Sequence, residues 1–231
     1  MDMRSYVAEM GNEGGAYTAE RAAALSGVPK STVYYWARNG HLTPSVSQSP
    51  LLWSYTDLLA LRTIYWLRRP KQAYDREVPA TSMAKVKRAL QELRRLDLDF
   101  FEEDRPTVAV TVQGEIAVNV DALPLHRAED GQLIERDLVN LVGPFEGLEG
   151  MKGPDLAWPR PTVQILPRKI SGAPHVAGTR LPTQSVFALA ARGFDIDRLA
   201  KIYPFIDRQA LRESVDLEEQ LKKNVRLRRA A

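Results

Sequence analysis

The residues of this chain that could do acid–base chemistry or bind a divalent cation are concentrated in one acidic run. Residues 97–104 hold five carboxylates in eight positions, a composition that could serve catalysis or coordinate magnesium. A solvated helix end followed by a turn has the same composition. Because no histidine, serine–base pair or phosphate-binding loop accompanies these acids, the sequence does not predict an enzyme.

Composition limits the other kinds of site chemistry. The 231 residues include no cysteine, which excludes disulfides, thiolate zinc sites and cysteine nucleophiles. His41, His126 and His175 lie far apart in sequence, so we expect no metal site and no cofactor, and we expect His175 to be a surface or structural residue. No apolar run reaches the roughly 20 residues that cross a bilayer, and the N-terminus has no apolar signal core, so a cytoplasmic globular protein is expected.

Basic side chains could recognise anions. The formal net charge of +3 is distributed unevenly along the chain. Residues 16–70 sum to +4, residues 106–160 to −5, and the last ten residues to +5. Two basic regions separated by an acidic middle suggest two acidic partners, or one partner and a self-contact.

A second candidate for anion binding is the glycine-rich run Gly178-Thr179-Arg180. Its backbone N–H groups could hold an anion, with Arg180 closing on it. Alternatively the run is a rigid turn, in which Arg180 donates to backbone carbonyls and Thr179 caps the turn. The residues alone leave both interpretations open.

The first basic region is expected on a helical unit. Thr18 can cap a helix that stops at Ser26-Gly27, and a second helix is predicted over Lys30 to Arg38. Helix, glycine-containing turn and helix form the helix-turn-helix pattern. A strand–loop–strand within residues 41–53 would be a wing, and Thr56 or Asp57 can cap a third helix that runs to Arg69.

The middle of the chain is expected to hold less regular structure. A helix is predicted from Thr81 or Ser82 to about Leu98, and residues 107–120 alternate as in a β-hairpin. A three-residue loop over residues 113–115 would pair Val112 with Ile116 and bury one face. Residues 121–161 lose this periodicity and are expected to be an irregular, acidic connection.

Three further helices are predicted near the C-terminus, capped by Thr183, Asp195 and Asp207. The expected fold class is therefore mainly α with small β. It comprises an N-terminal winged helix-turn-helix, a central β-hairpin with an irregular segment, and a C-terminal three-helix domain. The predicted divisions are 1–15 flexible N-terminus, 16–105 winged helix-turn-helix with following helices, 106–161 hairpin and acidic connection, 162–221 helical domain and 222–231 basic tail.

Residues of the first unit carry a family resemblance. They are Tyr17-Thr18, Ala22-Ala23, Gly27-Val28, Ser31-Thr32-Val33, Tyr35-Trp36, Gly40, Leu42, Pro44, Tyr55 and Asp57-Leu58. This stretch resembles the winged helix-turn-helix of MerR-type and excisionase-like DNA-binding proteins, although Tyr34 stands where MerR-type proteins usually carry arginine. The resemblance implies that the second helix lies in the major groove. The expected DNA-binding residues are Lys30, Ser31, Thr32, Tyr34, Tyr35, Arg38 and His41.

A second resemblance comes from the run Gly172-x-Pro174-x-x-x-Gly178-Thr179-Arg180-Leu181-Pro182, followed by Gly193 and Tyr203-Pro204. It looks like a small bacterial family long catalogued as a domain of unknown function. Its members are predicted to be VapB-like antitoxins encoded beside toxins with PIN-type nuclease domains.

Together the two resemblances imply a type II antitoxin. It would neutralise a PIN-type ribonuclease and repress its own operon by binding operator DNA, as a homodimer within a toxin–antitoxin complex. Basic side chains could enter the carboxylate pocket of the nuclease, so the expected toxin-binding residues are Lys222, Arg226, Arg228 and Arg229. A solvated tail or a DNA contact are the other interpretations of the last ten residues. The alternative function is a free-standing MerR-like transcription regulator that responds to a small ligand.

Overall fold

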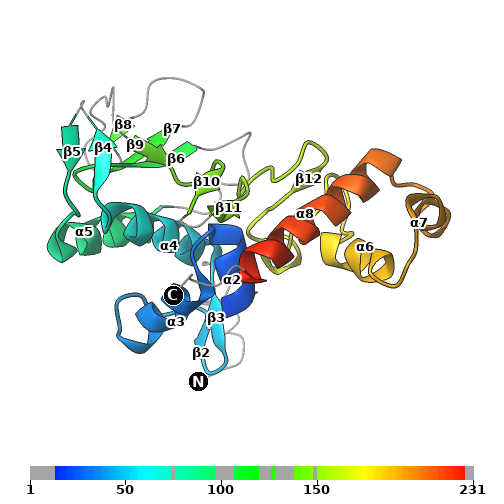
Figure 1. Ribbon diagram of the computed structural model, residues 1–231, viewed down its shortest axis with the longest axis horizontal. Helices are drawn as coiled ribbons and strands as arrows, with labels where there is room; N and C mark the ends of the chain where they lie inside the picture. Colours follow the sequence, from blue (N-terminus) through cyan, green and yellow to red (C-terminus); the bar gives the residue numbers. More distant parts are fainter. Residues whose placement is uncertain are drawn as a thin grey trace.

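Seven α-helices and five small antiparallel sheets make up the part of the chain that the computed structural model describes, which is residues 14–73, 76–96, 107–119, 126–127, 138–147 and 150–226. The predicted class, mainly α with small β, is confirmed. Figure 1 shows a broad body to which α6, α7 and the outer part of α8 are attached as an arm. None of the described helices is long and apolar enough to cross a membrane.

The N-terminal elements follow the predicted order. They are β1 (Tyr17–Thr18), α2 (Ala19–Ser26), α3 (Lys30–Arg38), β2 (Ser47–Gln48), β3 (Leu51–Trp53) and α4 (Tyr55–Leu67). Strand β3 lies between β1 and β2 in a three-stranded sheet. Thr18 caps α2 by accepting from the Arg21 N–H, and α2 ends at Gly27, whose φ of 72° only glycine adopts without strain.

The N-cap of α4 is Ser54, whereas Thr56 or Asp57 was predicted. The Ser54 hydroxyl accepts from the Asp57 N–H, and the Asp57 carboxylate accepts from the Ser54 N–H, which completes a capping box. Asp57 also accepts from the Ser45 N–H and hydroxyl. The Asp57 carboxylate, at the third position of α4, therefore completes the N-cap and also holds Ser45 in the loop that precedes β2.

Helix α4 lies at the centre of the main core. Eleven of its thirteen residues are buried, because α2 packs on one of its sides and α5 on another. The core extends from Ala19 on α2 to Leu221 on α8 in one continuous cluster. The first unit is therefore not a free-standing module but shares its core with the rest of the chain.

The middle of the chain contains more sheet than the sequence indicated. Its elements are β4 (Lys71–Ala73), β5 (Arg76–Val78), α5 (Met83–Leu93), β6 (Thr107–Thr111), β7 (Ile116–Asn119), β8 (His126–Arg127) and β9 (Leu138–Asn140). Strands β8-β7-β6-β9 form one sheet in that order, so the predicted hairpin is its centre. Helix α5 ends at Leu93, earlier than the predicted end near Leu98.

The predicted register of the central hairpin is wrong by two residues. Ile116 pairs with Val110 and Val118 with Val108, and the three-residue loop is 112–114. Gly114 has a φ of 88°, so it occupies the left-handed third position of this loop type, which glycine favours. The shift is even, so the same side chains share a face as in the prediction.

The remaining elements are β10 (Phe145–Glu146), β11 (Lys152–Gly153), β12 (Val163–Gln164), a short 3-10 helix (Ile170–Gly172), β13 (His175–Val176), α6 (Thr183–Ala190), α7 (Ile196–Ile202) and α8 (Arg208–Arg226). Part of the predicted irregular segment is thus strand. The boundary placed at residue 221 falls inside α8, which continues to Arg226. Asn224 is buried there and bonds to the backbone of Ala24 and Lys152.

Candidate nucleic-acid interface and partner surface

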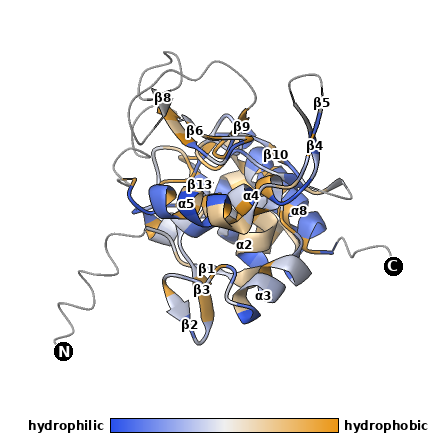
Figure 2. Cartoon of the chain, turned by 90° about the vertical axis from the view of Figure 1, so that its left-hand side faces the viewer, coloured by the Kyte–Doolittle hydropathy of each residue, from blue (hydrophilic) through white to orange (hydrophobic). Residues whose placement is uncertain are grey.

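Helix α3 and the β2–β3 hairpin lie side by side at one end of the molecule, which both Figure 1 and Figure 2 show. Val33 is the one fully buried residue of α3, and Trp36 packs against the main core from a partly buried position. Ser31, Tyr35 and Arg38 lie on the opposite, exposed side of the helix. Val33 and Trp36, three positions apart, thus anchor α3 and direct its polar face outward.

The two cations of α3, Lys30 and Arg38, differ in whether they have a partner. The Lys30 ammonium donates to the Glu20 carboxylate and lies 5.9 Å from the centre of the Tyr34 ring. That hydrogen bond raises the pKa of Lys30. Arg38 is exposed and has no hydrogen bond or ion pair to any other described residue. Arg38 is therefore the more available cation of the two.

The other expected DNA-binding residues occupy the same end. Tyr35 is 57% exposed, and its ring centre lies 5.8 Å from that of the exposed His41. Thr32 and Tyr34 are partly buried. The structure therefore brings all seven predicted residues to one end, with Ser31, Tyr35, Arg38 and His41 the most exposed among them.

Arg62 fixes the turn between α2 and α3 from within the core. Its side chain is fully buried and donates to six backbone carbonyls at 2.6–3.2 Å, without a carboxylate partner. The acceptors are Leu25, Ser26, Leu141, Val142, Gly143 and Pro154. Burial lowers the pKa of Arg62 to about 9. Its position beside the end of α2 satisfies C-terminal carbonyls of that helix.

A buried polar junction joins α2 to the C-terminal helices. Arg21 on α2 forms two hydrogen bonds of 2.6 and 2.7 Å with the Glu218 carboxylate on α8. The Thr183 hydroxyl at the start of α6 also donates to Glu218. Six residues further along α8, Asn224 donates to the Ala24 carbonyl. Sequence reasoning missed this junction, because its members lie up to 200 positions apart.

The Gly178-Thr179-Arg180 run is a tight turn after β13. The Thr179 hydroxyl donates to the Val176 carbonyl and accepts from the Leu181 N–H, so the predicted capping by threonine is confirmed. Arg180 is exposed, and no described residue accepts a hydrogen bond from it, so its predicted contact with carbonyls is wrong. The turn needs no guanidinium because Thr179 already satisfies its backbone.

His175 is a structural histidine, as expected. It is fully buried, with Nδ1 2.8 Å from the Ala173 carbonyl and Nε2 3.1 Å from the Gln164 side-chain nitrogen. Burial lowers the pKa of His175. This arrangement fits a neutral ring whose Nδ1–H donates and whose Nε2 accepts.

The expected toxin-binding residues lie at the end of α8. Lys222 and Arg226 are exposed, and the Lys222 ammonium lies 5.5 Å from the centre of the Phe187 ring. Arg228 and Arg229 lie outside the described residues. The sequence placed Lys222 and Arg226 in a tail, whereas the structure presents both on a packed helix.

The arm also carries an apolar surface that sequence reasoning missed. Phe205, between α7 and α8, is 98% exposed, and Ile202 at the end of α7 is 44% exposed. Beneath them, Val186, Leu199 and Leu211 form a small separate core. Phe205 and Ile202 are the large apolar side chains exposed on the described part of the arm, so they are candidates for a contact with a partner.

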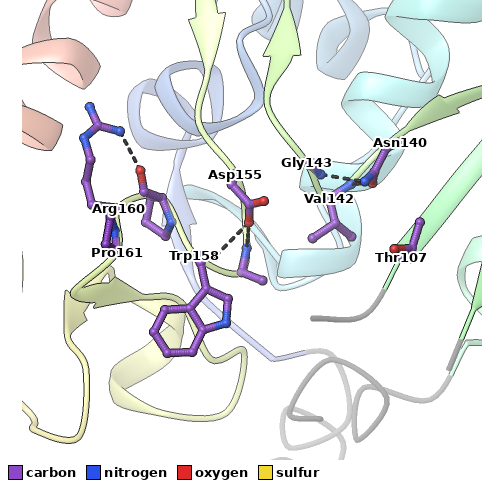
Figure 3. Close-up of a pocket in the computed structure, with 10 residues that line it drawn as sticks. Thr107, Asn140, Val142, Gly143, Asp155, Trp158, Arg160 and Pro161 are labelled. Carbon is purple, nitrogen blue, oxygen red and sulfur yellow. Dashed lines mark hydrogen bonds between the residues drawn. The ribbon is translucent and has the colours of Figure 1, made fainter. Parts of the chain in front are cut away.

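A cavity of about 510 Å³ lies between residues 140–143 and 155–161 (Figure 3). Its polar groups already serve the fold. Asp155 Oδ1 accepts from the N–H groups of Ala157 and Trp158, Asn140 Oδ1 accepts from two backbone N–H groups, and Arg160 pairs with Asp216. Its lining offers a carboxylate but brings no nucleophile next to a base.

A search of the described residues for a metal site gave a negative result. No group of three or more His, Asp or Glu residues that could hold a metal ion is found among the described residues. The acidic run 97–104 lies outside them. The candidate sites are therefore the α3 end and the arm.

Comparison with known proteins gave one match. A family described as a protein of unknown function (DUF433) matches residues 163–216, from β12 into α8. No curated protein and no solved structure matches the chain. The matched stretch lies within the predicted domain 162–221 and stops short of Glu218 and Asn224, which hold α8 against the N-terminal unit.

Proposed function

We propose that residues 17–67 are a winged helix-turn-helix that binds duplex DNA. The observation that carries this proposal is the exposed end formed by α3 and the β2–β3 hairpin, where α3 is anchored by Val33 and Trp36 and presents its polar side outward. In this proposal α3 enters the major groove and the hairpin is the wing beside it. The MerR-like and excisionase-like residue pattern supports the same assignment.

The roles of the exposed side chains follow from their chemistry. Arg38 would neutralise a phosphate, since it has no competing partner among the described residues. Ser31 and Tyr35 would contact bases or sugars. Lys30 would contribute less than Arg38, because a phosphate must compete with Glu20 for its ammonium group.

Binding to duplex DNA across a salt series tests this proposal. Loss of one phosphate contact lowers the slope of log affinity against log salt by about 0.9. We expect that decrease for Arg38→Ala and a smaller one for Lys30→Ala. Arg192→Ala, which removes an exposed cation on the arm, is the control. If the slope and affinity of Arg38→Ala equal those of the unchanged protein, α3 is not the DNA-binding helix.

We further propose that the chain is an antitoxin whose arm binds a PIN-type ribonuclease. The exposed Phe205 and Ile202 support a protein contact at the start of α8, and Lys222 and Arg226 supply cations near its other end, beside α2. Those cations could pair with the carboxylates that hold magnesium in the nuclease. Autoregulation would follow, because one chain would carry both the DNA-binding end and the partner surface.

Co-expression with the neighbouring reading frame tests the antitoxin proposal. We expect a PIN-type nuclease to co-purify with the full chain and its activity to be inhibited. Phe205→Ser should weaken the complex at least tenfold while leaving the fold intact, because Phe205 contributes little to the core. Ala188→Ser, on the exposed side of α6, is the control. A neighbour without nuclease character and no co-purifying protein would contradict the proposal.

A further inference from the structure

Helix α5 exposes a stripe of positive charge that the assignments above do not use. Residues 83–96 contain five Lys or Arg side chains and one acid, Glu92. Val86, Ala89, Leu90 and Leu93 face the core, whereas all five cations are exposed, four of them within residues 87–95. We name these four the α5 stripe: Lys87, Arg88, Arg94 and Arg95.

Helical spacing places the four cations together. Lys87 and Arg94 differ by seven positions, as do Arg88 and Arg95. Arg94 is the C-cap of α5, so it lies about two turns, or roughly 10 Å along the axis, from Lys87 on the same side of the helix. Arg95 is in the turn that follows directly. Glu92 lies four positions after Arg88 and three before Arg95, so it is the one acid beside the stripe within residues 83–96. No side chain of the stripe forms a hydrogen bond or ion pair with another described residue. With one acid against four cations, the stripe keeps a net positive charge in this stretch.

Helix α5 lies in the same layer of the molecule as α4. In Figure 1 and Figure 2, α4 and α5 form a layer, with the β8-β7-β6-β9 sheet on one side and α3 with the β2–β3 hairpin on the other. Helix α5 packs on α4 and on β7. Because the buried residues of α5 pack on α4 and on β7, the stripe lies on sides of the helix that contact neither element.

We propose that the α5 stripe binds the sugar–phosphate backbone of duplex DNA beside the segment that α3 contacts. This inference rests on the proposed DNA-binding function. Duplex DNA carries a charge every roughly 1.7 Å along its axis, so a stripe about 10 Å long faces several phosphates. The contacts position the protein on the duplex and do not depend on base sequence.

The make-up of the stripe favours DNA over an acidic protein. The residues exposed between the cations are Ala84 and Gln91, and no aromatic or large aliphatic side chain is exposed on α5. Protein interfaces usually have an apolar or aromatic centre. Long cationic side chains without such a centre are the usual ligands of phosphates.

The test measures binding of a mixed-sequence DNA duplex by the full chain across a salt series. Arg88→Gln/Arg95→Gln removes two stripe charges, and Arg180→Gln/Arg192→Gln removes two exposed charges from the arm. Both double variants change the net charge equally. We expect the stripe variant to lower the salt slope by about 1.8, at about 0.9 for each lost phosphate contact. The arm variant should keep the slope of the unchanged protein.

Different results separate this inference from the proposed function. Equal slopes for the two double variants, with binding still weakened by Arg38→Ala, would overturn the stripe and leave the α3 interface standing. No binding by the unchanged protein would overturn both. If the stripe variant instead binds DNA normally but releases a co-purifying acidic protein, the stripe belongs to that protein and the inference is wrong. Circular dichroism of each variant confirms that it is folded.

Discussion

Replacement of Arg62 by methionine removes a guanidinium that donates to six backbone carbonyls and keeps a long side chain in the same space. The acceptors belong to three separate segments: the end of α2, residues 141–143 and Pro154. Methionine fills part of the volume but offers no donor. All six carbonyls would lose a hydrogen bond, and the three segments would lose the group that joins them.

The magnitude follows from two opposing terms. The Val142 carbonyl keeps the Leu156 N–H as a donor, so five carbonyls lose the donor that Arg62 supplied. A buried carbonyl left without a donor costs about 1 kcal/mol or more, so the five cost about 5 kcal/mol. The unchanged protein also bears the cost of burying a charge, which is several kcal/mol and which the variant avoids. That same burial lowers the pKa of Arg62 to about 9. We expect a net loss of about 3 kcal/mol in the free energy of unfolding, a large part of the total of about 5–15 kcal/mol.

Urea unfolding at neutral pH, followed by circular dichroism and tryptophan fluorescence, measures this loss. Arg62→Lys keeps the charge but not the planar fork, so it should lose at least half as much stability as Arg62→Met. The control is Arg180→Met, an exposed site where a change within about 0.5 kcal/mol is expected. A loss below about 1 kcal/mol for Arg62→Met would refute the view that this network holds the three segments together.

Three further variants test other contacts by the same measurement. Gly27→Ala should cost about 2 kcal/mol or more, because φ is 72° and the new Cβ would lie 2.7 Å from the Gly153 nitrogen. Gly40→Ala, at a φ of 64° in open space, should show only the backbone strain. Glu218→Ala should cost about 3 kcal/mol because Arg21 is left partly buried without its carboxylate, and Glu218→Gln should cost less. For His175, burial lowers the pKa, so the unfolded chain binds the proton more readily and stability should fall as the pH drops below about 6.5. His175→Gln should flatten this dependence, and an unchanged slope would contradict it.

The sequence predicted local structure well where proline, asparagine or glycine marks the ends of a helix. The bounds of α3 were predicted correctly, because Pro29 precedes its first turn and Asn39-Gly40 follows its last. The predictions failed where a distant contact decided the outcome. The predicted boundary between a helical domain and a basic tail at residue 221 lies inside α8. The helix continues to Arg226, and Asn224 donates to the carbonyls of Ala24 and Lys152. No spacing within α8 reveals those acceptors.

Arg62 illustrates a site that the sequence signalled only indirectly. The run from Tyr55 to Leu67 is apolar around the whole helix, which predicts burial on every side. A lone arginine in such a helix must then be buried as well, and it needs acceptors from other elements. The sequence could therefore indicate that Arg62 is constrained, but not that its acceptors lie at the end of α2 and near residue 142.

The α5 stripe was hidden by a different effect. Residues 71–105 have no net charge, because the acids at 97–104 offset the cations before them. The sum over the segment hides these cations, whereas sorting residues 83–96 by burial separates five exposed cations from the buried apolar residues. Charge sums over long windows therefore miss surfaces that helical geometry assembles.

The contacts of α8 bear on how the two proposed activities would be connected. Glu218 and Asn224 bond to α2, the first helix of the proposed DNA-binding unit, while Lys222 and Arg226 lie on the same two turns and face outward. A partner that binds these cations would contact a helix that hydrogen bonds already hold against α2. Those bonds join Glu218 to the Arg21 side chain and Asn224 to the Ala24 carbonyl. A shift of α8 would have to break those bonds or move α2 together with α8. Arg62 in turn donates to the Leu25 and Ser26 carbonyls at the C-terminal end of α2. Coupling between partner and DNA would therefore pass through α2 as a rigid body rather than through a flexible linker.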